Sequence, residues 1–142
     1  MKRLHVHLNV KDLDQSIDFY STLFDQSPSV LKSDYAKWDL DDPSVNFTIS
    51  TQGEAGLQHL GIEAIETQEL QQLYQRVEAI DAPKFDEGET TCCYARSEKS
   101  WINDPQDISW ELFRTLGKAE QMREVDIPST SNGCCEARCC QT

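Results

Sequence analysis

The chain lacks the features by which proteins cross membranes or hold nucleic acids. No apolar run in its 142 residues approaches the roughly 18 residues of a membrane span. The start at Met1 leads into interleaved histidines, where a signal peptide would have an apolar core. Basic residues are few, since 13 Lys plus Arg stand against 25 Asp plus Glu and leave a net charge of -12. Nucleic acids and anionic membranes need a basic surface, so we expect neither as a partner. We expect a cytoplasmic protein with one domain.

Cysteine is present only as adjacent pairs. The pairs are Cys92-Cys93, Cys134-Cys135 and Cys139-Cys140. Consecutive α-carbons lie about 3.8 Å apart, whereas bridged cysteines usually need at least about 4.4 Å, so a relaxed disulfide within a pair is disfavoured. In a reducing compartment these thiols would stay free. Thiolates select soft or borderline ions and metalloids, which makes zinc, cadmium, copper(I) and trivalent arsenic the candidate ligands.

The first half of the chain predicts one strand, one helix and three further strands. Apolar and polar residues alternate over residues 4–10, and Asp14 is positioned to cap a helix over residues 15–24. Strand-forming segments follow at residues 29–32, 36–40 and 45–50, separated by turn formers. The predicted order is therefore βαβββ.

The same order recurs in the second half when the chain is shifted by 54 positions. His5 then falls on His59, and the first helix cap falls near Thr67. A second helix is predicted over residues 68–79, and strands are predicted over residues 84–87, 92–97 and 109–114. Two similar units predict an α+β fold of paired βαβββ modules with pseudo-twofold packing.

The domain limits follow from the repeat and from the composition after it. We expect one domain over residues 1–116, with modules at about residues 1–54 and 55–116. Beyond it the chain becomes polar and charged, and residues 128–133 read Pro-Ser-Thr-Ser-Asn-Gly. Such composition is typical of flexible segments, so residues 117–142 are predicted to be a flexible tail that carries four cysteines.

Three residues on predicted strands are candidate metal ligands. The repeat places His5 and His59 at equivalent positions of the two first strands. Glu111 lies between Trp110 and Leu112, so strand alternation turns its carboxylate to the other face. A buried carboxylate requires a cation. Singly, each histidine is more often structural and the glutamate can face solvent, but the shared register favours a metal site.

His7 competes with His5 because it lies two residues on and shares the strand face. Its repeat partner is Gly61, whereas the partner of His5 is a histidine, so symmetry favours His5 and leaves His7 beside the site or in a structural role. Glu111 falls on Thr48 in the first module, and threonine is a poor ligand. Two histidines and one carboxylate leave open positions, which suits iron(II) and oxygen activation. Zinc, nickel or manganese would give the same pattern.

The opening run HVHLNVKDLDQSIDFY, residues 5–20, resembles that of the vicinal oxygen chelate superfamily. This superfamily includes glyoxalases, bleomycin-resistance proteins and extradiol dioxygenases. Residues 33–38 and 45–48, and especially the run TTCCYA at residues 90–95, resemble the organoarsenical carbon-arsenic lyases, whose relatives are the cadmium-induced proteins. The double cysteine before tyrosine distinguishes these lyases from ordinary glyoxalases and catechol dioxygenases.

The resemblance implies a site and an activity. Iron(II) would be held by His5, His59 and Glu111, with dioxygen as co-substrate. Cys92 and Cys93 would bind the trivalent arsenic of a methyl or aromatic arsenical. The implied reaction is cleavage of the carbon-arsenic bond with release of arsenite, and the residues expected around the site are His7, Thr48 and Tyr94.

Two local features qualify this expectation. For both sulfurs to reach one atom the backbone cannot be a regular strand, so we expect a mobile loop around Thr90 and Thr91. The family's last turn usually reads Asp-Pro-x-Gly-Asn, whereas this chain has Asp-Pro-Gln-Asp-Ile at residues 104–108. Aspartate tolerates the left-handed conformation better than most residues, so the turn is expected to survive.

Other functions stay open at the level of sequence. The thiols alone would suffice for a protein that sequesters cadmium or arsenite without turnover. A glyoxalase-like isomerase is disfavoured because Thr48 stands where a fourth ligand would be, and a metal-free drug-binding protein is disfavoured by the retained ligand set. The tail cysteines either lack a defined role or capture metalloid, and these are Cys134, Cys135, Cys139 and Cys140. The metal, the preferred arsenical and the oligomeric state, including a homodimer, are also open.

Overall fold

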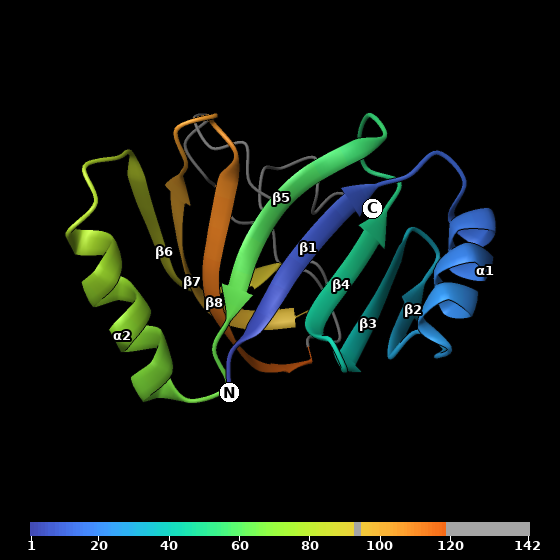
Figure 1. Ribbon diagram of the computed structural model, residues 1–142, viewed down its shortest axis with the longest axis horizontal. Helices are drawn as coiled ribbons and strands as arrows, with labels where there is room; N and C mark the ends of the chain where they lie inside the picture. Colours follow the sequence, from blue (N-terminus) through green and yellow to red (C-terminus); the bar gives the residue numbers. More distant parts are fainter. Residues whose placement is uncertain (93–94, 119–142) are drawn as a thin grey trace.

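The computed structural model describes the backbone of residues 1–92 and 95–118, and the side chains of residues 1–85 and 98–116. Its elements follow the predicted order βαβββ twice (Figure 1). They are β1 (Arg3–Asn9), α1 (Leu13–Phe24), β2 (Val30–Lys32), β3 (Tyr35–Asp41), β4 (Ser44–Ser50), β5 (Gly56–Glu63), α2 (Thr67–Glu78), β6 (Lys84–Cys92), β7 (Ala95–Asn103) and β8 (Ser109–Lys118).

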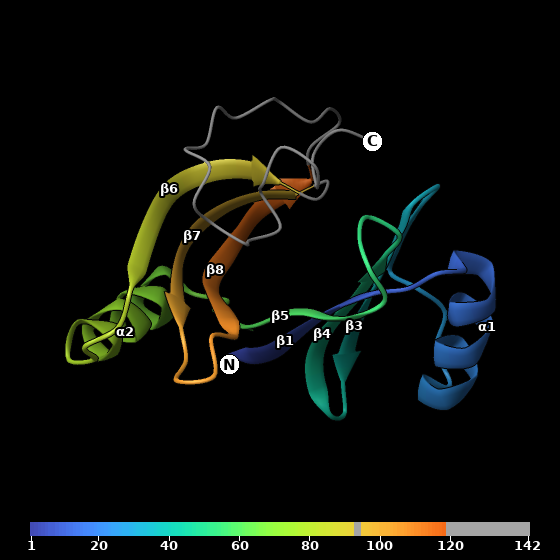
Figure 2. The ribbon, with the colours of Figure 1, turned by 90° about the horizontal axis from the view of Figure 1, so that it is seen from above.

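All eight strands form one sheet in the order β2-β3-β4-β1-β5-β8-β7-β6. Within each unit the first strand pairs in parallel with the last, β1 with β4 and β5 with β8. The units join where β1 and β5 pair antiparallel. Figure 2 shows the sheet strongly curved, with α1 and α2 on its outer side at opposite ends. The α+β fold of paired βαβββ modules is confirmed.

Apolar residues fill the space between each helix and the outer face of its unit. In the first unit, Tyr20 and Phe24 of α1 pack against Trp38 and Phe47. The second unit has a cluster of the same kind, which contains Ala64, Leu70, Leu73, Val77, Ile102 and Leu112. Because successive side chains of a strand point to opposite faces, the inner face is left for the polar residues that both units bury.

Both helices begin slightly before the predicted positions. Asp12, rather than Asp14, caps α1, and its side chain accepts a hydrogen bond from the Gln15 amide at 3.0 Å. Asp14 lies in the first turn, where its carboxylate interacts favourably with the positive end of the helix dipole. In α2 the cap is Glu66, whose amide donates to the Glu69 carboxylate at 3.1 Å.

The second half of the sheet differs from the prediction in its strand limits. β6 and β7 form a long hairpin in which Thr90 pairs with Ser97 and Thr91 with Arg96. The prediction of a loop around Thr90 and Thr91 was therefore wrong, because the hairpin continues regular pairing up to Cys92. β8 extends to Lys118, two residues beyond the predicted domain limit. Within the described ranges, neither helix has the length and apolarity needed to cross a bilayer.

The turn before β8 has the predicted conformation. Asp107 adopts a left-handed backbone with φ of 64°. The Asp104 carboxylate accepts hydrogen bonds from the amides of Gln106 and Ile108 at 2.9 and 3.0 Å. Asp107 in place of the usual glycine is thus compatible with the turn, and β8 begins two residues later at Ser109.

Candidate metal centre

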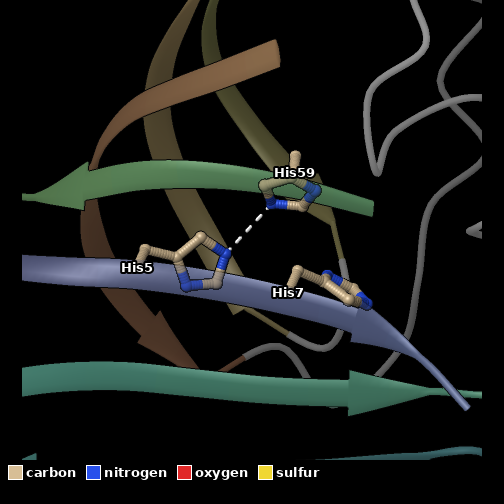
Figure 3. A group of neighbouring side chains, drawn as sticks. All are labelled: His5, His7 and His59. Atoms are coloured by element: carbon tan, nitrogen blue, oxygen red, sulfur yellow. Dashed lines mark hydrogen bonds between the residues drawn. The ribbon is translucent and has the colours of Figure 1, made fainter. Parts of the chain in front are cut away.

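Strand alternation brings the candidate ligands onto the inner face. His5 and His7 lie on β1, His59 on β5 and Glu111 on β8, and all four are at most 5% exposed. His7 pairs directly with His59 across the two strands (Figure 3). The neighbouring pair on β5 and β8 is Gly61 with Glu111.

Gly61 permits the close approach of β8 to β5. A Cβ atom at this position would lie 2.5 Å from the Glu111 carbonyl oxygen and 3.2 Å from its Cβ. In the first unit the corresponding strand pair is His7 with Thr48. The structure therefore confirms the predicted correspondence of Glu111 with Thr48 and gives the physical reason for glycine opposite the carboxylate.

Three ligand atoms converge on one point. His5 Nε2 lies 3.0 Å from His59 Nε2, and Glu111 Oε2 lies 3.1 Å from His59 Nε2 and 3.5 Å from His5 Nε2. Nitrogen and oxygen ligands about 2.1 Å from an ion, on neighbouring positions at right angles, are about 3.0 Å apart. The triangle is thus of the size that three ligands of one transition-metal ion would form.

The His5 ring is oriented by Asn46 on β4. His5 Nδ1 lies 3.1 Å from both the main-chain oxygen and the side-chain oxygen of Asn46. A carbonyl oxygen only accepts, so Nδ1 carries the proton and Nε2 presents a lone pair to the site. Asn46 in turn donates to Glu63 Oε2 at 3.1 Å, and Thr48 donates to Asn46 Oδ1 at 3.4 Å. Thr48 thus contacts Asn46, which in turn contacts the candidate ligand His5.

The His59 ring is held in a matching way. Its Nδ1 contacts Oε1 of Gln58, and when Nδ1 donates there, Nε2 is left as a lone pair that faces the same point. The ring packs edge-on against Trp101, with centroids 5.1 Å apart, as the His5 ring does against Phe113 at 5.1 Å. Aromatic edges therefore fix both rings and keep water away from them.

Glu111 uses its two oxygens differently. Oε2 faces the histidines, whereas Oε1 accepts a hydrogen bond from Nζ of Lys99 at 2.9 Å. Burial by itself raises the pKa of Glu111, but the Lys99 ammonium, and after it His59 and His5, lower the pKa well below its usual value of 4.5. Glu111 is therefore an ionised carboxylate at neutral pH, the form that binds a metal ion.

His5 and His7 are neutral at neutral pH. Burial, followed by the charge of His59, lowers the pKa of His5 from 6.5 to about 4, although Glu111 and Asn46 oppose this change. Burial also lowers the pKa of His7 well below 6.5. Neutral imidazole is the metal-binding form, so proton competition at His5 is weak in the folded protein.

His7 offers an alternative ligand set. Nitrogen atoms of His5, His7 and His59 all lie within 4.8 Å of one another. His7 Nε2, however, lies 2.8 Å from the Ser50 hydroxyl, and its ring packs edge-on near Tyr35. We favour the set with Glu111, because Oε2 lies within 3.5 Å of both Nε2 atoms and supplies the negative charge that a divalent ion needs.

The cysteine predictions fall at the border of the described structure. Cys92 is the last residue of β6, where its backbone pairs with Ala95. The other predicted residues lie outside the described residues, and these are Cys93, Tyr94, Cys134, Cys135, Cys139 and Cys140. Conversely, two buried residues that contact the site were not predicted, Lys99 and Asn46. The sequence does carry a signal for Lys99, since it lies two residues before Trp101 and thus shares its face.

The comparisons with known proteins agree with this architecture. The family model described as "Glyoxalase/Bleomycin resistance protein/Dioxygenase superfamily" matches residues 2–112. The "Trivalent organoarsenical cleaving enzyme" of Bacillus sp. (strain MD1) is 42% identical over 125 residues, which cover 85% of this chain and 78% of that protein. The "Cadmium-induced protein CadI" of Mycobacterium bovis is 33% identical over 122 residues, with 84% and 80% covered.

Among solved structures, the Mn(II)-bound glyoxalase from Novosphingobium aromaticivorans has a TM-score of 0.59 at 17% identity. The match covers 90% of this chain and 46% of that one, and at this identity it supports the fold alone. The sequence match over nearly the whole described region, together with the double βαβββ sheet, places the protein in a known group. The chain belongs to the glyoxalase/bleomycin resistance protein/dioxygenase superfamily.

Proposed function

We propose that the protein cleaves the carbon-arsenic bond of trivalent organoarsenicals, with iron(II) and dioxygen, and releases arsenite and an oxidised organic fragment. The observation that carries the proposal is the triangle of His5 Nε2, His59 Nε2 and Glu111 Oε2, with sides of 3.0, 3.1 and 3.5 Å. A relative named for cleavage of trivalent organoarsenicals, 42% identical, supports the substrate class.

The donor set fits a resident metal ion. Two neutral imidazoles and one carboxylate bind first-row divalent ions and leave positions open for other ligands. Iron(II) held by His5, His59 and Glu111 would supply activation of dioxygen. The protein would fix the directions of two of these ligands through Asn46 and Lys99, which contact His5 and Glu111.

The cysteine pair Cys92-Cys93 is proposed to bind the substrate. Each thiol would replace one hydroxyl on trivalent arsenic, forming one sulfur-arsenic bond and releasing one water, with no change in oxidation state. The organic group would stay bonded to arsenic, and the arsenic would be held at the end of β6. Holding a reactant in this way converts a bimolecular step into an effectively intramolecular one.

The inner face provides surroundings suited to this chemistry. His5, His59 and Glu111 are 5%, 0% and 5% exposed, so bulk water is largely kept from the ligand atoms. Exclusion of water strengthens the electrostatic interactions within the site and limits side reactions. These residues position and desolvate the reacting groups, whereas the cysteines provide the contact with arsenic.

Arsenic speciation after incubation would test the proposal. The anaerobically purified full chain, loaded with iron(II), is mixed with oxygen and a trivalent methyl or phenyl arsenical. We expect arsenite from the parent and from Glu78→Gln, an exposed carboxylate of α2, and none from Cys92→Ser or Glu111→Gln. No arsenite from the parent, or equal arsenite from parent and Cys92→Ser, would contradict the proposal.

A second candidate is a binding protein for cadmium or arsenite without turnover. The relative named as a cadmium-induced protein, at 33% identity, favours it. In that case arsenic would bind in stoichiometric amount, the binding would survive His59→Ala, and oxygen would not be consumed. A glyoxalase-like isomerase is less well supported, because Thr48 corresponds to Glu111 and provides no fourth ligand.

We also propose that the catalytic domain, predicted over residues 1–116, consists of two modules and ends with β8 at Lys118, and that the residues after it are a separate tail. Because β8 extends to Lys118, truncation after Lys118 is the appropriate test. Unchanged turnover and unchanged arsenic stoichiometry would remove any role of Cys134, Cys135, Cys139 and Cys140 in metalloid capture. A cytoplasmic location and a homodimer stay predictions.

A further inference from the structure

Lys99 is a buried cation in direct contact with the candidate metal centre. It lies on β7, is 2% exposed, and donates from Nζ to Glu111 Oε1 at 2.9 Å. The same Nζ lies 5.8 Å from the centroid of the Trp101 ring, which itself packs against His59. Lysine is almost never fully buried unless it is paired, so this position has a specific role.

The ion pair divides the Glu111 carboxylate. Oε1 is held by Lys99, whereas Oε2 lies 3.1 Å from His59 Nε2 and 3.5 Å from His5 Nε2. A carboxylate can bind one metal ion through one oxygen or through both. With Oε1 engaged by an ammonium group, only Oε2 is free to turn to the ion.

We propose that Lys99 is a positioning residue that makes Glu111 a one-oxygen ligand and thereby keeps a coordination position open for an anionic ligand. The inference rests on the metal site of the proposed function, and it goes beyond that function by assigning the coordination mode and its cause. If Glu111 bound through both oxygens, the second oxygen would fill one of the positions that two histidines and a carboxylate leave open.

The charge of Lys99 acts in the same direction. A divalent ion with one carboxylate and two neutral imidazoles carries a net charge of +1, and the Lys99 ammonium adds a positive charge beside it. In a desolvated site an added positive charge favours a negatively charged ligand at the open position. Lys99 therefore supports anion binding through geometry and through charge.

Azide binding to the cobalt(II)-loaded full chain would test this inference without turnover. The visible absorption of the cobalt ion follows azide addition, and the variants are Lys99→Met, which removes both hydrogen bond and charge, and Lys99→Gln, which keeps a donor. Glu78→Gln is the matched control. We expect azide affinity to fall by about tenfold or more in Lys99→Met, with partial retention in Lys99→Gln, since the buried charge contributes strongly.

The parent and the variants separate the possible failures. If metal-loaded Lys99→Met binds azide as tightly as the parent, the inference is wrong, while the proposed function stands. If the parent itself binds no metal at His5, His59 and Glu111, the proposed function is wrong. If Lys99→Met does not fold, a crystal structure of the metal-loaded parent decides, because Glu111 bound through both oxygens would contradict the inference without any variant.

Discussion

Glu111→Gln should weaken the fold as well as the metal site. The substitution removes the charge that compensates Lys99, although the amide oxygen can still accept a hydrogen bond. Lys99 is 2% exposed and Glu111 is 5% exposed, so the remaining ammonium would be left uncompensated in the interior. Breaking a buried ion pair by removing one partner costs about 3–5 kcal/mol, and the retained hydrogen bond favours the lower end.

The expected loss is large enough for thermal and urea unfolding of the metal-free protein. About 3 kcal/mol corresponds to a decrease in Tm of roughly 10 °C for a chain of this size. The double variant Glu111→Gln/Lys99→Met should recover most of this loss, because it removes both charges, yet it should still fail to bind metal. Glu78→Gln, on the exposed side of α2, should leave the Tm unchanged.

This design separates stability from ligation. If Glu111→Gln unfolds at the same temperature as the parent, the contact between Glu111 and Lys99 is not a desolvated ion pair. If the double variant is as unstable as the single one, the loss does not come from the uncompensated charge. Either result would contradict the assignment of Glu111 and Lys99 as a buried ion pair, whatever happens to metal binding.

Three other predictions test separate parts of the site. The unfolded chain protonates His5 near its usual pKa of 6.5 and the folded metal-free protein only near about 4. The unfolded state thus binds more protons within that window, and stability is lost as the pH falls through it. The pKa shift of His5 corresponds to about 3 kcal/mol in the free energy of unfolding. Urea unfolding at several pH values measures this difference. If the parent and His5→Asn show the same pH dependence, the prediction is wrong. Asn46→Ala removes the side-chain contact with His5 Nδ1 but keeps the main-chain oxygen contact, so metal affinity should fall by only about tenfold. Unchanged affinity in a metal titration would exclude this role of Asn46. Gly61→Ala places a Cβ 2.5 Å from the Glu111 carbonyl oxygen. The free energy of unfolding should therefore decrease by about 1–3 kcal/mol, and the Tm by several degrees. An unchanged Tm with full metal content would contradict the close approach of the two strands.

The convergence of His5, His59 and Glu111 could be predicted because it follows from repeat register and alternation. The repeat sets His5 and His59 on equivalent strands, and those strands, β1 and β5, pair directly. Period-two alternation placed Glu111 opposite Trp110 and Leu112, and the structure has both of those in or against the cluster under α2. The sequence pattern was sufficient to predict these three positions, because they depend only on strand alternation and on the symmetry of the two units.

Lys99 could not be predicted in the same way. A lysine in a polar strand usually lies at the surface, and its contact with Glu111 depends on the register of β7 against β8. That register pairs Lys99 with Phe113 and Trp101 with Glu111, and it shifts between Arg96 and Ser97. The spacing of Lys99 to Trp101 indicates only that the two side chains share a strand face, whereas the register that brings Lys99 to Glu111 follows from the packing of the whole sheet.

The β6 and β7 hairpin was also only partly predicted. The sequence indicated short strands at residues 84–87 and 92–97, whereas the structure pairs residues 84–92 with residues 95–102. These strands contain many Ser, Thr, Glu and Lys residues, so hydrophobic alternation is weak and their pairing depends on neighbouring strands.

Oxygen uptake, measured together with arsenite release, tests whether the protein cleaves the carbon-arsenic bond with dioxygen. The full chain, loaded anaerobically with iron(II), receives a trivalent methyl or phenyl arsenical and then oxygen. We expect oxygen to be consumed only when iron and arsenical are both present, in step with the arsenite formed. Arsenic bound by the protein with no oxygen consumed and no arsenite released would contradict this expectation.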